Sequence, residues 1–374
     1  MPPTVINVGS APDVRDVVHR AVQALAEGQI VAFPTETVYG VAASARNESA
    51  VDRLVEIKQR KDKHALSLAV KSAEDAFDYV PDASPVGRRL ARRCWPGPVT
   101  LVMADSHPDS LIQQLPAGVR KRVAPSGTVG LRVPGHQLIL EVLRLMPGPL
   151  ALSSANRAGM QDSITADQVV EAFGNDVDLV IDDGKSQFGQ ASSVVQIQDG
   201  TFRMLREGVV SDDALKRLSS FLIVLICTGN TCRSPMAEML CKMRVAEKLG
   251  CKIGEIEDRG VIVTSAGIAA GSGGRAAAEA LQVMEENGLD LSEHVTQPLS
   301  DRLVRHADLL LTMTNQHRQA IVGHWANAAD RTQVLCPDGT DVSDPIGGPQ
   351  ELYRRCAEQI DKALAERINS LDLV

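Results

Sequence analysis

The pattern of apolar and polar positions differs between the two halves of the chain. In the second half, short apolar runs rich in β-branched residues recur at 221–227, 261–264, 309–313 and 333–335. Amphipathic stretches lie between or after them, near 235–249, 274–287 and 298–306, and a last one has an apolar residue at every fourth position from Leu352 to Ile368. Buried strands that alternate with amphipathic helices predict an α/β fold with a parallel sheet covered on both faces.

The first half mixes helical and strand patterns less regularly. Helical periodicity occurs at 12–27, 49–60 and 84–93, and strand patterns occur at 29–33, 99–103, 129–133 and 194–197. This combination predicts an α/β domain with a mixed sheet, whose strand order the pattern does not give. A polar stretch at 212–220 separates the halves. We therefore expect a first domain over 1–211, a linker over 212–220 and a second domain over 221–374.

Length and composition support two soluble domains. The chain has 374 residues, more than the roughly 250–300 at which single cores stop growing. No apolar run reaches the roughly 18–20 residues that span a bilayer, and the start resembles no signal peptide. The net charge of -8 argues against wholesale nucleic-acid binding, and the seven scattered cysteines fit neither a disulfide framework nor a zinc site. We expect a cytoplasmic protein in which a cysteine is available as a nucleophile.

The segment Cys-Thr-Gly-Asn-Thr-Cys-Arg-Ser-Pro at 227–235 carries the clearest chemical signal. A buried strand ends at Cys227, and a helix starts near Arg233. The small polar loop between them consists of Thr228, Gly229, Asn230, Thr231 and Cys232. Its N–H groups can turn inward and, with the helix N-terminus, hold a tetrahedral anion and favour a thiolate. Arg233 would complete the cradle, and the Ser234 hydroxyl would stabilise the sulfur as a leaving group.

A reaction through a cysteinyl-phosphate also needs an acid for the leaving group. Asp344 is a candidate, because it lies in a Gly/Pro loop beyond a predicted strand, although an Asp-Pro pair alone is an ordinary turn. Cys232 has two interpretations that stay open. It either forms a reversible disulfide with Cys227 or only fills the loop.

Residues 221–370 resemble the low-molecular-weight protein phosphatase family. The resemblance rests on 227–235, 264–268, 307–314 and Asp344-Pro345. It implies a four-stranded parallel sheet with helices on both faces and a two-step reaction without metal or cofactor. Cys227 would be the nucleophile, Arg233 the transition-state clamp and Asp344 the general acid, while Asn230 and Ser234 position the loop.

The segments 227–238, Met-Thr-Asn-Gln-His at 313–317 and Asp-Pro-Ile-Gly-Gly at 344–348 resemble the bacterial protein-arginine phosphatases in particular. Tyrosine-directed members carry a bulky aliphatic residue where this chain has Thr231, and aromatic residues where it has Ile346. A phenol ring requires apolar walls, whereas a guanidinium requires polar acceptors and a carboxylate. We therefore favour phosphoarginine in proteins as the substrate, with phosphotyrosine as the alternative.

Polar and cationic residues recur at turns and strand ends of the first half. They are Thr35, Lys58, Arg60, Arg132, Ser154, Asn156, Ser192 and Arg206. Each alone is equally a helix cap or a solvated side chain, but together they indicate an anion-binding cleft. The Gly-rich P-loop and dinucleotide motifs are missing from the sequence, so a nucleotide would bind by another route.

The order of these motifs over about residues 12–210 resembles the YrdC family of threonylcarbamoyl-AMP synthases. The resemblance implies synthesis of threonylcarbamoyl-AMP from L-threonine, bicarbonate and ATP with Mg²⁺, for tRNA modification by other proteins. Lys58 and Arg60 would hold phosphates, Ser154 and Asn156 would contact threonine and nucleotide, and Arg206 would reach the nucleotide. No side chain is assigned as a metal ligand. The chain departs from the family at His64-Ala65, Ala69 and Ser193, near the expected threonine pocket.

A rival interpretation makes the first half a nucleotide- or RNA-binding module without turnover, joined to a protein-tyrosine phosphatase. The arginines at 88, 89, 92 and 93 and the basic segment 120–122 are either an RNA-facing patch or a solvated helix face. The solvated face is the simpler interpretation.

Overall fold

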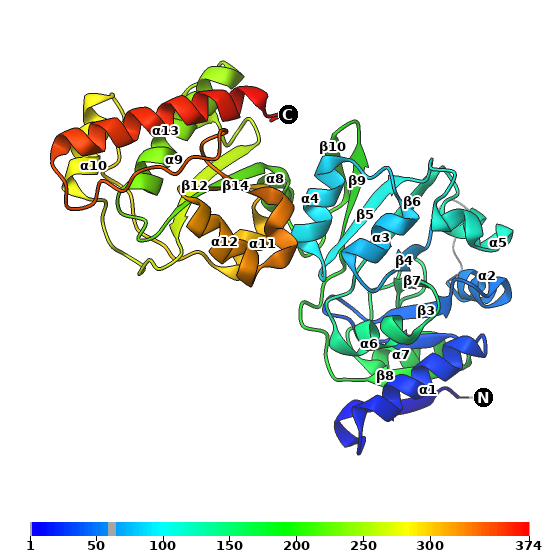
Figure 1. The fold of residues 1–374 in the computed structure, drawn as a ribbon. Coiled ribbons are helices and arrows are strands. Elements are labelled where there is room, and N and C mark those ends of the chain that lie inside the picture. The colour runs from blue at the N-terminus through cyan, green and yellow to red at the C-terminus, as the bar shows by residue number, and fades with distance from the viewer. Residues whose placement is uncertain (1, 59–64, 374) are drawn as a thin grey trace. The chain divides into compact units, whose positions relative to one another are not determined.

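The computed structural model describes residues 2–58 and 65–373 and separates into two compact units that divide between Leu218 and Ser219 (Figure 1). Residues of the expected linker form helix α8 (Asp212–Ser219), whose Leu215 is fully buried in the core of the first unit. Among the described residues, no helix is both long and apolar enough to span a membrane.

The first unit is built on a mixed sheet. Its strands are β1 (Thr4–Asn7), β2 (Val31–Phe33), β3 (Gly40–Ser44), β4 (Ser67–Ala69), β5 (Val99–Ala104), β6 (Thr128–Arg132), β7 (Leu150–Ser154), β8 (Leu179–Asp182), β9 (Ser193–Gln198) and β10 (Thr201–Arg206). They are ordered β1-β8-β2-β3-β7-β4-β6-β5-β9-β10, with parallel pairs such as β5–β9 and antiparallel pairs such as β3–β7. The predicted mixed sheet is confirmed.

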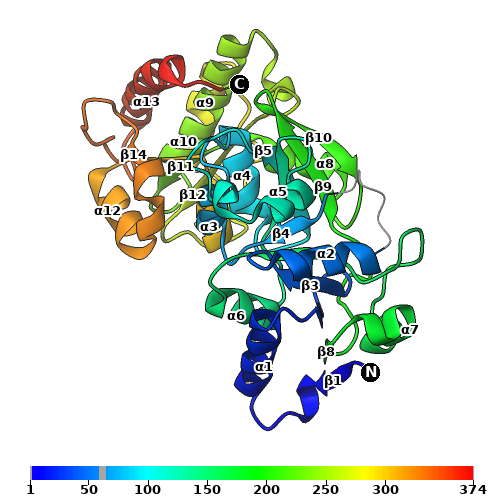
Figure 2. The same cartoon turned by 90° about the vertical axis from the view of Figure 1, so that its right-hand side faces the viewer.

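Helices cover both faces of this sheet. They are α1 (Val14–Ala26), α2 (Glu48–Ile57), α3 (Ala73–Tyr79), α4 (Pro85–Cys94), α5 (Ala117–Val123), α6 (Gln137–Leu145) and α7 (Ala166–Phe173), with 3-10 turns η1 (Val8–Ser10), η2 (Leu111–Gln114) and η3 (Gly174–Asp176). Successive strand residues face opposite sides, so Val31 and Phe33 pack with α1 and α6, and Ala32 packs with the other layer. Helices α1 and α6 lie side by side in Figure 2.

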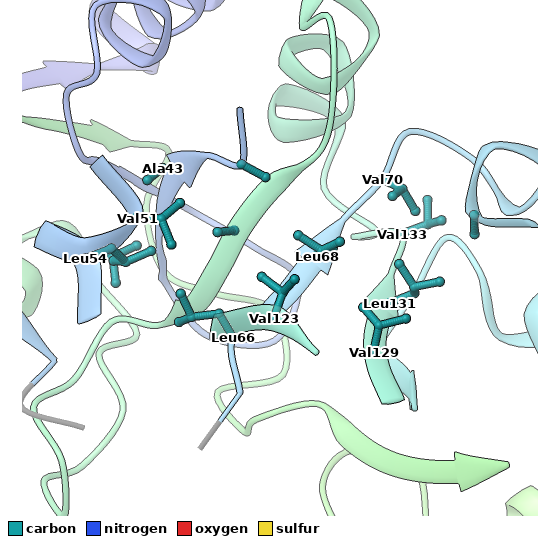
Figure 3. Close-up of a cluster of buried hydrophobic side chains, with 14 of the residues drawn as sticks. Ala43, Val51, Leu54, Leu66, Leu68, Val70, Val123, Val129, Leu131 and Val133 are labelled. Carbon is teal, nitrogen blue, oxygen red and sulfur yellow. The ribbon is translucent and has the colours of Figure 1, made fainter. Parts of the chain in front are cut away.

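The second layer holds the larger apolar core of the first unit. Figure 3 shows part of it, where Leu68 of β4 and Leu131 of β6, which are paired in register, lie among buried valines and leucines. Val51 and Leu54 of α2 also belong to this cluster. The packing fixes α2 against the sheet and thereby places the residue that follows α2, Lys58.

The second unit contains a four-stranded, fully parallel sheet ordered β12-β11-β13-β14, which confirms the predicted fold. Its strands are β11 (Phe221–Cys227), β12 (Val261–Gly267), β13 (Leu309–Thr312) and β14 (Thr332–Val334). Its helices are α9 (Arg233–Leu249), α10 (Ala278–Glu286), α11 (Asp301–His306), α12 (Asn315–His324) and α13 (Gln350–Ser370), with 3-10 turns η4 (Ile253–Glu255) and η5 (Ala326–Arg331).

Both faces of the parallel sheet are covered. Ile223 and Leu225 of β11 pack with α9, α10 and α13, whereas the alternate residues Val224 and Ile226 pack with α11 and α12. Helix α13 lies along α9 (Figure 1). Its predicted apolar face is buried except at Leu352, which is 43% exposed and lies over Gly348.

Candidate functional sites

The loop at 228–232, called the phosphate loop below, joins the end of β11 to the start of α9. Cys227, the last residue of the strand, is buried. Helix α9 begins at Arg233, so the N–H groups of its first turn have no acceptor within the helix and are available to an anion. Asn230 has φ 56°, a left-handed conformation that asparagine tolerates and that turns the loop sharply.

A chain of hydrogen bonds orients the hydroxyl beside the Cys227 sulfur. Nδ2 of Asn230 donates to Oγ of Ser234 and to Oγ of Ser265, each at 2.9 Å. Ser265 donates in turn to Glu238 at 2.7 Å. Because Ser234 already accepts from Asn230, its own proton can point to Sγ of Cys227, 3.0 Å away. The N–H of Asn230 donates to the same sulfur at 3.2 Å, so two donors stabilise a thiolate.

A buried arginine and a carboxylate complete this arrangement. Arg233 is 5% exposed, and its Nη2 donates to Oδ2 of Asp344, while Nη1 donates to the carbonyl of Val342 at 3.4 Å. The Asp344 carboxylate is 42% exposed and also accepts the N–H of Ile346 at 3.2 Å. The structure thus brings the sequence-predicted carboxylate to the arginine that follows the phosphate loop.

The remaining loop residues have distinct surroundings. Oγ1 of Thr231, which is half-buried, lies 3.5 Å from Sγ of Cys232. Sγ of Cys232 also lies 3.6 Å from the hydroxyl of Tyr353. Cys227 and Cys232 are both free thiols, and Gly229 lies between Thr228 and the left-handed Asn230.

Sequence reasoning missed several side chains around the phosphate loop. Nε2 of His294 donates to the carbonyl of Asn230 at 2.9 Å, and Nε2 of His317 lies 2.9 Å from Oγ1 of Thr228. Ser265 and Glu238 also contribute to the loop without having been predicted. A signal for His317 was present, since its segment Met-Thr-Asn-Gln-His contributed to the resemblance above.

A cavity of about 690 Å³ in the first unit gathers the residues predicted there. Its lining includes Thr35, Lys58, Arg132, Ser154, Asn156, Ser192 and Arg206. Arg60 lies outside the described residues. Other hydroxyl-bearing residues also line the cavity, among them Tyr39, Ser67, Thr100, Ser126 and Thr128. The cavity combines cations with many hydroxyls, as an anionic ligand requires.

Lys58 follows α2 and reaches the end of β7. Its Nζ donates to the carbonyl of Ser154 at 2.7 Å, to Oδ1 of Asn156 at 2.8 Å and to the carbonyl of Asn156. Oγ of Ser154 also donates to Oδ1 of Asn156 at 2.6 Å. This buried cation therefore fixes the turn after β7 at the cavity wall.

A buried ion pair lies at the end of β6. Nη2 of Arg132 donates to Oε1 of Glu36 at 2.7 Å and to Oγ1 of Thr37 at 2.9 Å. Both charged side chains are less than a tenth exposed, at 8% and 7%. Thr35 donates to the carbonyl of Val38 at 2.5 Å within the same turn. The Pro-Thr-Glu-Thr turn thus holds Arg132 in position at the cavity.

Ser192, just before β9, and Arg206, the last residue of β10, also line the cavity. Nη2 of Arg206 donates to the carbonyl of Ser192 at 2.7 Å, and Oγ of Ser192 lies 3.2 Å from Oγ1 of Thr100. Burial lowers the pKa of Arg206, and the positive charge of Arg132 adds to this effect against the opposing charge of Asp162. Two cations therefore act on the same part of the cavity.

The residues that depart from the family pattern lie partly at the cavity and partly away from it. Ala65 lines the cavity, His64 lies outside the described residues, and Ala69 is buried in the core beneath α1 and α6. The hydroxyl of Ser193 donates to the carbonyl of Val210 at 2.7 Å and accepts the N–H of that residue at 2.9 Å. Ser193 thus serves the packing of the strand and does not belong to the cavity lining.

The basic residues set aside above have structural partners. The guanidinium of Arg88 lies 4.4 Å from the centre of the Phe77 ring, and Nη1 of the buried Arg93 donates to the carbonyl of Leu218 at 2.6 Å. Arg122 pairs with Asp52 at 3.1 Å. The interpretation as a solvated helix face therefore does not hold for Arg93, which is buried and hydrogen-bonded.

The described residues of the two sites form no ready metal centre. In the part of the chain that the structure describes, no three His, Cys, Asp or Glu residues cluster as metal ligands. The described lining of the cavity also contains no carboxylate.

Comparison with known families separates the chain at the same place. Residues 23–208 match the Sua5/YciO/YrdC family model, described as telomere recombination, and residues 222–373 match the model for low molecular weight phosphotyrosine protein phosphatase. In the first half, the threonylcarbamoyl-AMP synthase of Pyrococcus abyssi is 35% identical over 184 residues, 49% of this chain and 51% of that protein. The chain thus spans about half the length of this relative.

A curated relative also matches the second half of the chain, and a solved structure matches the fold. The protein-arginine-phosphatase of Bacillus subtilis is 37% identical over 153 residues, which are 40% of this chain and 95% of that protein. A crystal structure of P. abyssi Sua5 complexed with L-threonine has a TM-score of 0.52 and 25% identity, and the match covers 70% of this chain and 92% of that chain.

Proposed function

Because the first half of the chain belongs to the Sua5/YrdC family and the second to the low-molecular-weight protein phosphatase family, we propose a bifunctional enzyme. The first unit makes threonylcarbamoyl-AMP from L-threonine, bicarbonate and ATP. The second unit hydrolyses phosphoarginine in proteins. The first product would be consumed by tRNA-modification proteins.

The cavity of the first unit supports the synthase assignment. Adenylyl transfer depends on positioning the reactants and on neutralising phosphate charge, and Lys58, Arg132 and Arg206 of the lining can supply the positive charge. The hydroxyls and amide of the lining suit the polar groups of an amino acid and a ribose. The relative solved with L-threonine supports threonine as the second ligand. This convergence of cations and hydroxyls in one cavity is the observation on which the synthase proposal rests.

Mg²⁺ fits this site only when it is bound to the phosphates of ATP. Mg²⁺ is usually bound by one or two carboxylates together with substrate phosphates, and the described lining provides hydroxyls and cations instead. The ion would neutralise phosphate charge, while Lys58 and Arg132 orient the nucleotide. No residue of the described lining is assigned to it.

Pyrophosphate release by the full-length protein tests the synthase proposal. Release should require L-threonine, bicarbonate and MgATP together, and mass spectrometry should detect threonylcarbamoyl-AMP. Nucleotide binding without pyrophosphate in any mixture would favour the rival, a binding module without turnover. Serine in place of threonine is the matched control for the amino-acid pocket.

The phosphatase proposal rests on the convergence of Cys227, Arg233 and Asp344. The Cys227 thiolate attacks phosphorus, the P–N bond breaks, and Asp344 gives its proton to the leaving guanidine nitrogen. Water then attacks the cysteinyl-phosphate, Asp344 accepts a proton from it, and the S–P bond breaks to return the thiolate. Arg233 and the N–H groups of the phosphate loop neutralise the transferred phosphoryl oxygens in both steps.

Several features support phosphoarginine over phosphotyrosine. Thr231 supplies a half-buried hydroxyl next to the site, and Ile346, not an aromatic residue, follows Asp344-Pro345. The relative named for phosphoarginine matches nearly the whole second unit. Asp344 already pairs with the guanidinium of Arg233, so its position suits a guanidinium leaving group as well.

Competing substrates test this choice. The protein should release phosphate faster from a phosphoarginine protein than from a phosphotyrosine peptide, and Thr231→Ile should reverse the preference. Thr231→Ser, which keeps the hydroxyl, is the matched control and should keep the original order. Equal rates on both substrates, unaltered by Thr231→Ile, would remove Thr231 as the determinant.

A further inference from the structure

A histidine without a role in the proposed reaction contacts the first residue of the phosphate loop, Thr228. Nε2 of His317 lies 2.9 Å from Oγ1 of Thr228, the residue that follows Cys227. His317 is only 5% exposed, whereas Thr228 is exposed. This contact joins two residues that are 89 positions apart in the sequence.

The backbone that carries His317 is held in place by contacts that do not involve Thr228. Oγ1 of Thr314 accepts the N–H of His317 at 3.2 Å and caps α12. The N–H of Asn315 donates to Oδ1 of Asp341 at 2.7 Å, which ties the start of α12 to the loop before α13. Because β13 is paired with β11, the start of α12 adjoins the phosphate loop.

The buried ring nitrogen identifies the tautomer. Nδ1 of His317 has no hydrogen-bond partner among the described residues. A buried N–H without an acceptor is rarer than an unsatisfied lone pair, so the proton belongs on Nε2. Burial and then the charge of Arg233 lower the pKa of His317, against the opposing carboxylates of Asp344 and Asp341, so the ring is neutral near pH 7. Nε2–H therefore donates to Oγ1 of Thr228.

This direction of donation leaves the Thr228 hydroxyl proton unused. Thr228 is exposed and follows the nucleophile in the chain, and its hydroxyl already accepts from the imidazole. We infer that Thr228 is a further hydrogen-bond donor to the bound phosphoryl group and that His317 is the positioning residue that directs it. This inference rests on the phosphatase site proposed above and adds a substrate contact to it.

Binding of orthovanadate to the full-length protein tests the inference without requiring turnover. Thr228→Val and His317→Ala should each weaken vanadate binding by about 10- to 150-fold, the effect of losing one hydrogen bond to a charged group. The double variant should be no weaker than either single variant, because both act through one contact. His317→Gln, whose side-chain amide can still donate to Thr228, should restore most of the affinity. Gln319→Ala, at an exposed position of the same helix, is the matched control.

Three results would overturn the inference: wild-type affinity in Thr228→Val, additive losses in the double variant, or failure of His317→Gln to restore binding. Nitrogen-15 NMR of the unmodified protein gives an independent answer, since the Nε2–H tautomer is expected and the Nδ1–H tautomer would refute it. A protein that shows the coupled vanadate effects but hydrolyses no phosphorylated substrate would refute the proposed function and leave this inference standing.

Discussion

Removal of the Ser234 hydroxyl should slow the second chemical step of the phosphatase more than the first. Oγ of Ser234 lies 3.0 Å from Sγ of Cys227, and its proton is directed there by Asn230. In the second step, negative charge develops on the sulfur as the S–P bond breaks, so the donor stabilises that transition state. In the first step, the negative charge is already on the sulfur before the reaction and decreases as the S–P bond forms. The hydroxyl therefore contributes less to that transition state.

The size of the effect follows from this one contact. A hydrogen bond to a charged group contributes about 1.5–3 kcal/mol. Since about 1.4 kcal/mol corresponds to a factor of ten, Ser234→Ala should slow hydrolysis of the cysteinyl-phosphate by about 10- to 150-fold. The slower second step should then make the phosphorylated enzyme accumulate during turnover.

Stopped-flow kinetics with p-nitrophenyl phosphate would show this accumulation. Ser234→Ala should give a burst of p-nitrophenol equal to the enzyme concentration, followed by slow turnover. Ser265→Ala is the matched control, because it leaves the contact between Ser234 and Cys227 intact and should lose less activity. The reasoning would be refuted by wild-type turnover without a burst in Ser234→Ala, or by an equal loss in Ser265→Ala.

Three further predictions concern other residues. Asp344→Asn should slow hydrolysis of phosphoarginine about a hundredfold or more but affect p-nitrophenyl phosphate less, because that leaving group needs no proton; equal losses would contradict a general acid. Ser193→Ala should destabilise the first unit by about 1–3 kcal/mol, seen as a lower calorimetric midpoint of the full chain, without weakening ATP binding; an unchanged midpoint would contradict its packing role. Burial lowers the pKa of His136, whose Nδ1 accepts the N–H of Leu138 at 3.3 Å. As the pH falls, His136 is therefore protonated in the unfolded chain before it is protonated in the folded one. The first unit should lose stability below about pH 6.5 for this reason. The midpoint should therefore drop between about pH 7 and about pH 5, and a similar drop in His136→Asn would contradict this cause.

The phosphate loop could be predicted from sequence because its parts are contiguous. Strand, small loop, arginine and helix start follow one another in 227–235, and each is a local signal. Contacts across the sheet could not be predicted in this way. The pairs His317–Thr228 and Glu36–Arg132 depend on strand order, which the apolar pattern does not encode.

Two central strands of the first unit also escaped sequence reasoning. β3 reads Gly-Val-Ala-Ala-Ser and β7 reads Leu-Ala-Leu-Ser-Ser, with few β-branched residues and no alternation of polar and apolar positions. Both are buried on two faces in the middle of the sheet, where small residues allow close packing. Lys58 and Asn156 appeared as separate candidates in the sequence, and β7 with its turn brings them together.

The central claim is that one chain carries two separate active sites, and a crossed assay tests it most directly. Pyrophosphate release and phosphoarginine hydrolysis would be measured on the same preparations of wild type, Lys58→Ala and Cys227→Ser. We predict that Lys58→Ala abolishes only pyrophosphate release and that Cys227→Ser abolishes only hydrolysis. Full hydrolysis by Cys227→Ser, or loss of both activities in either variant, would contradict the account.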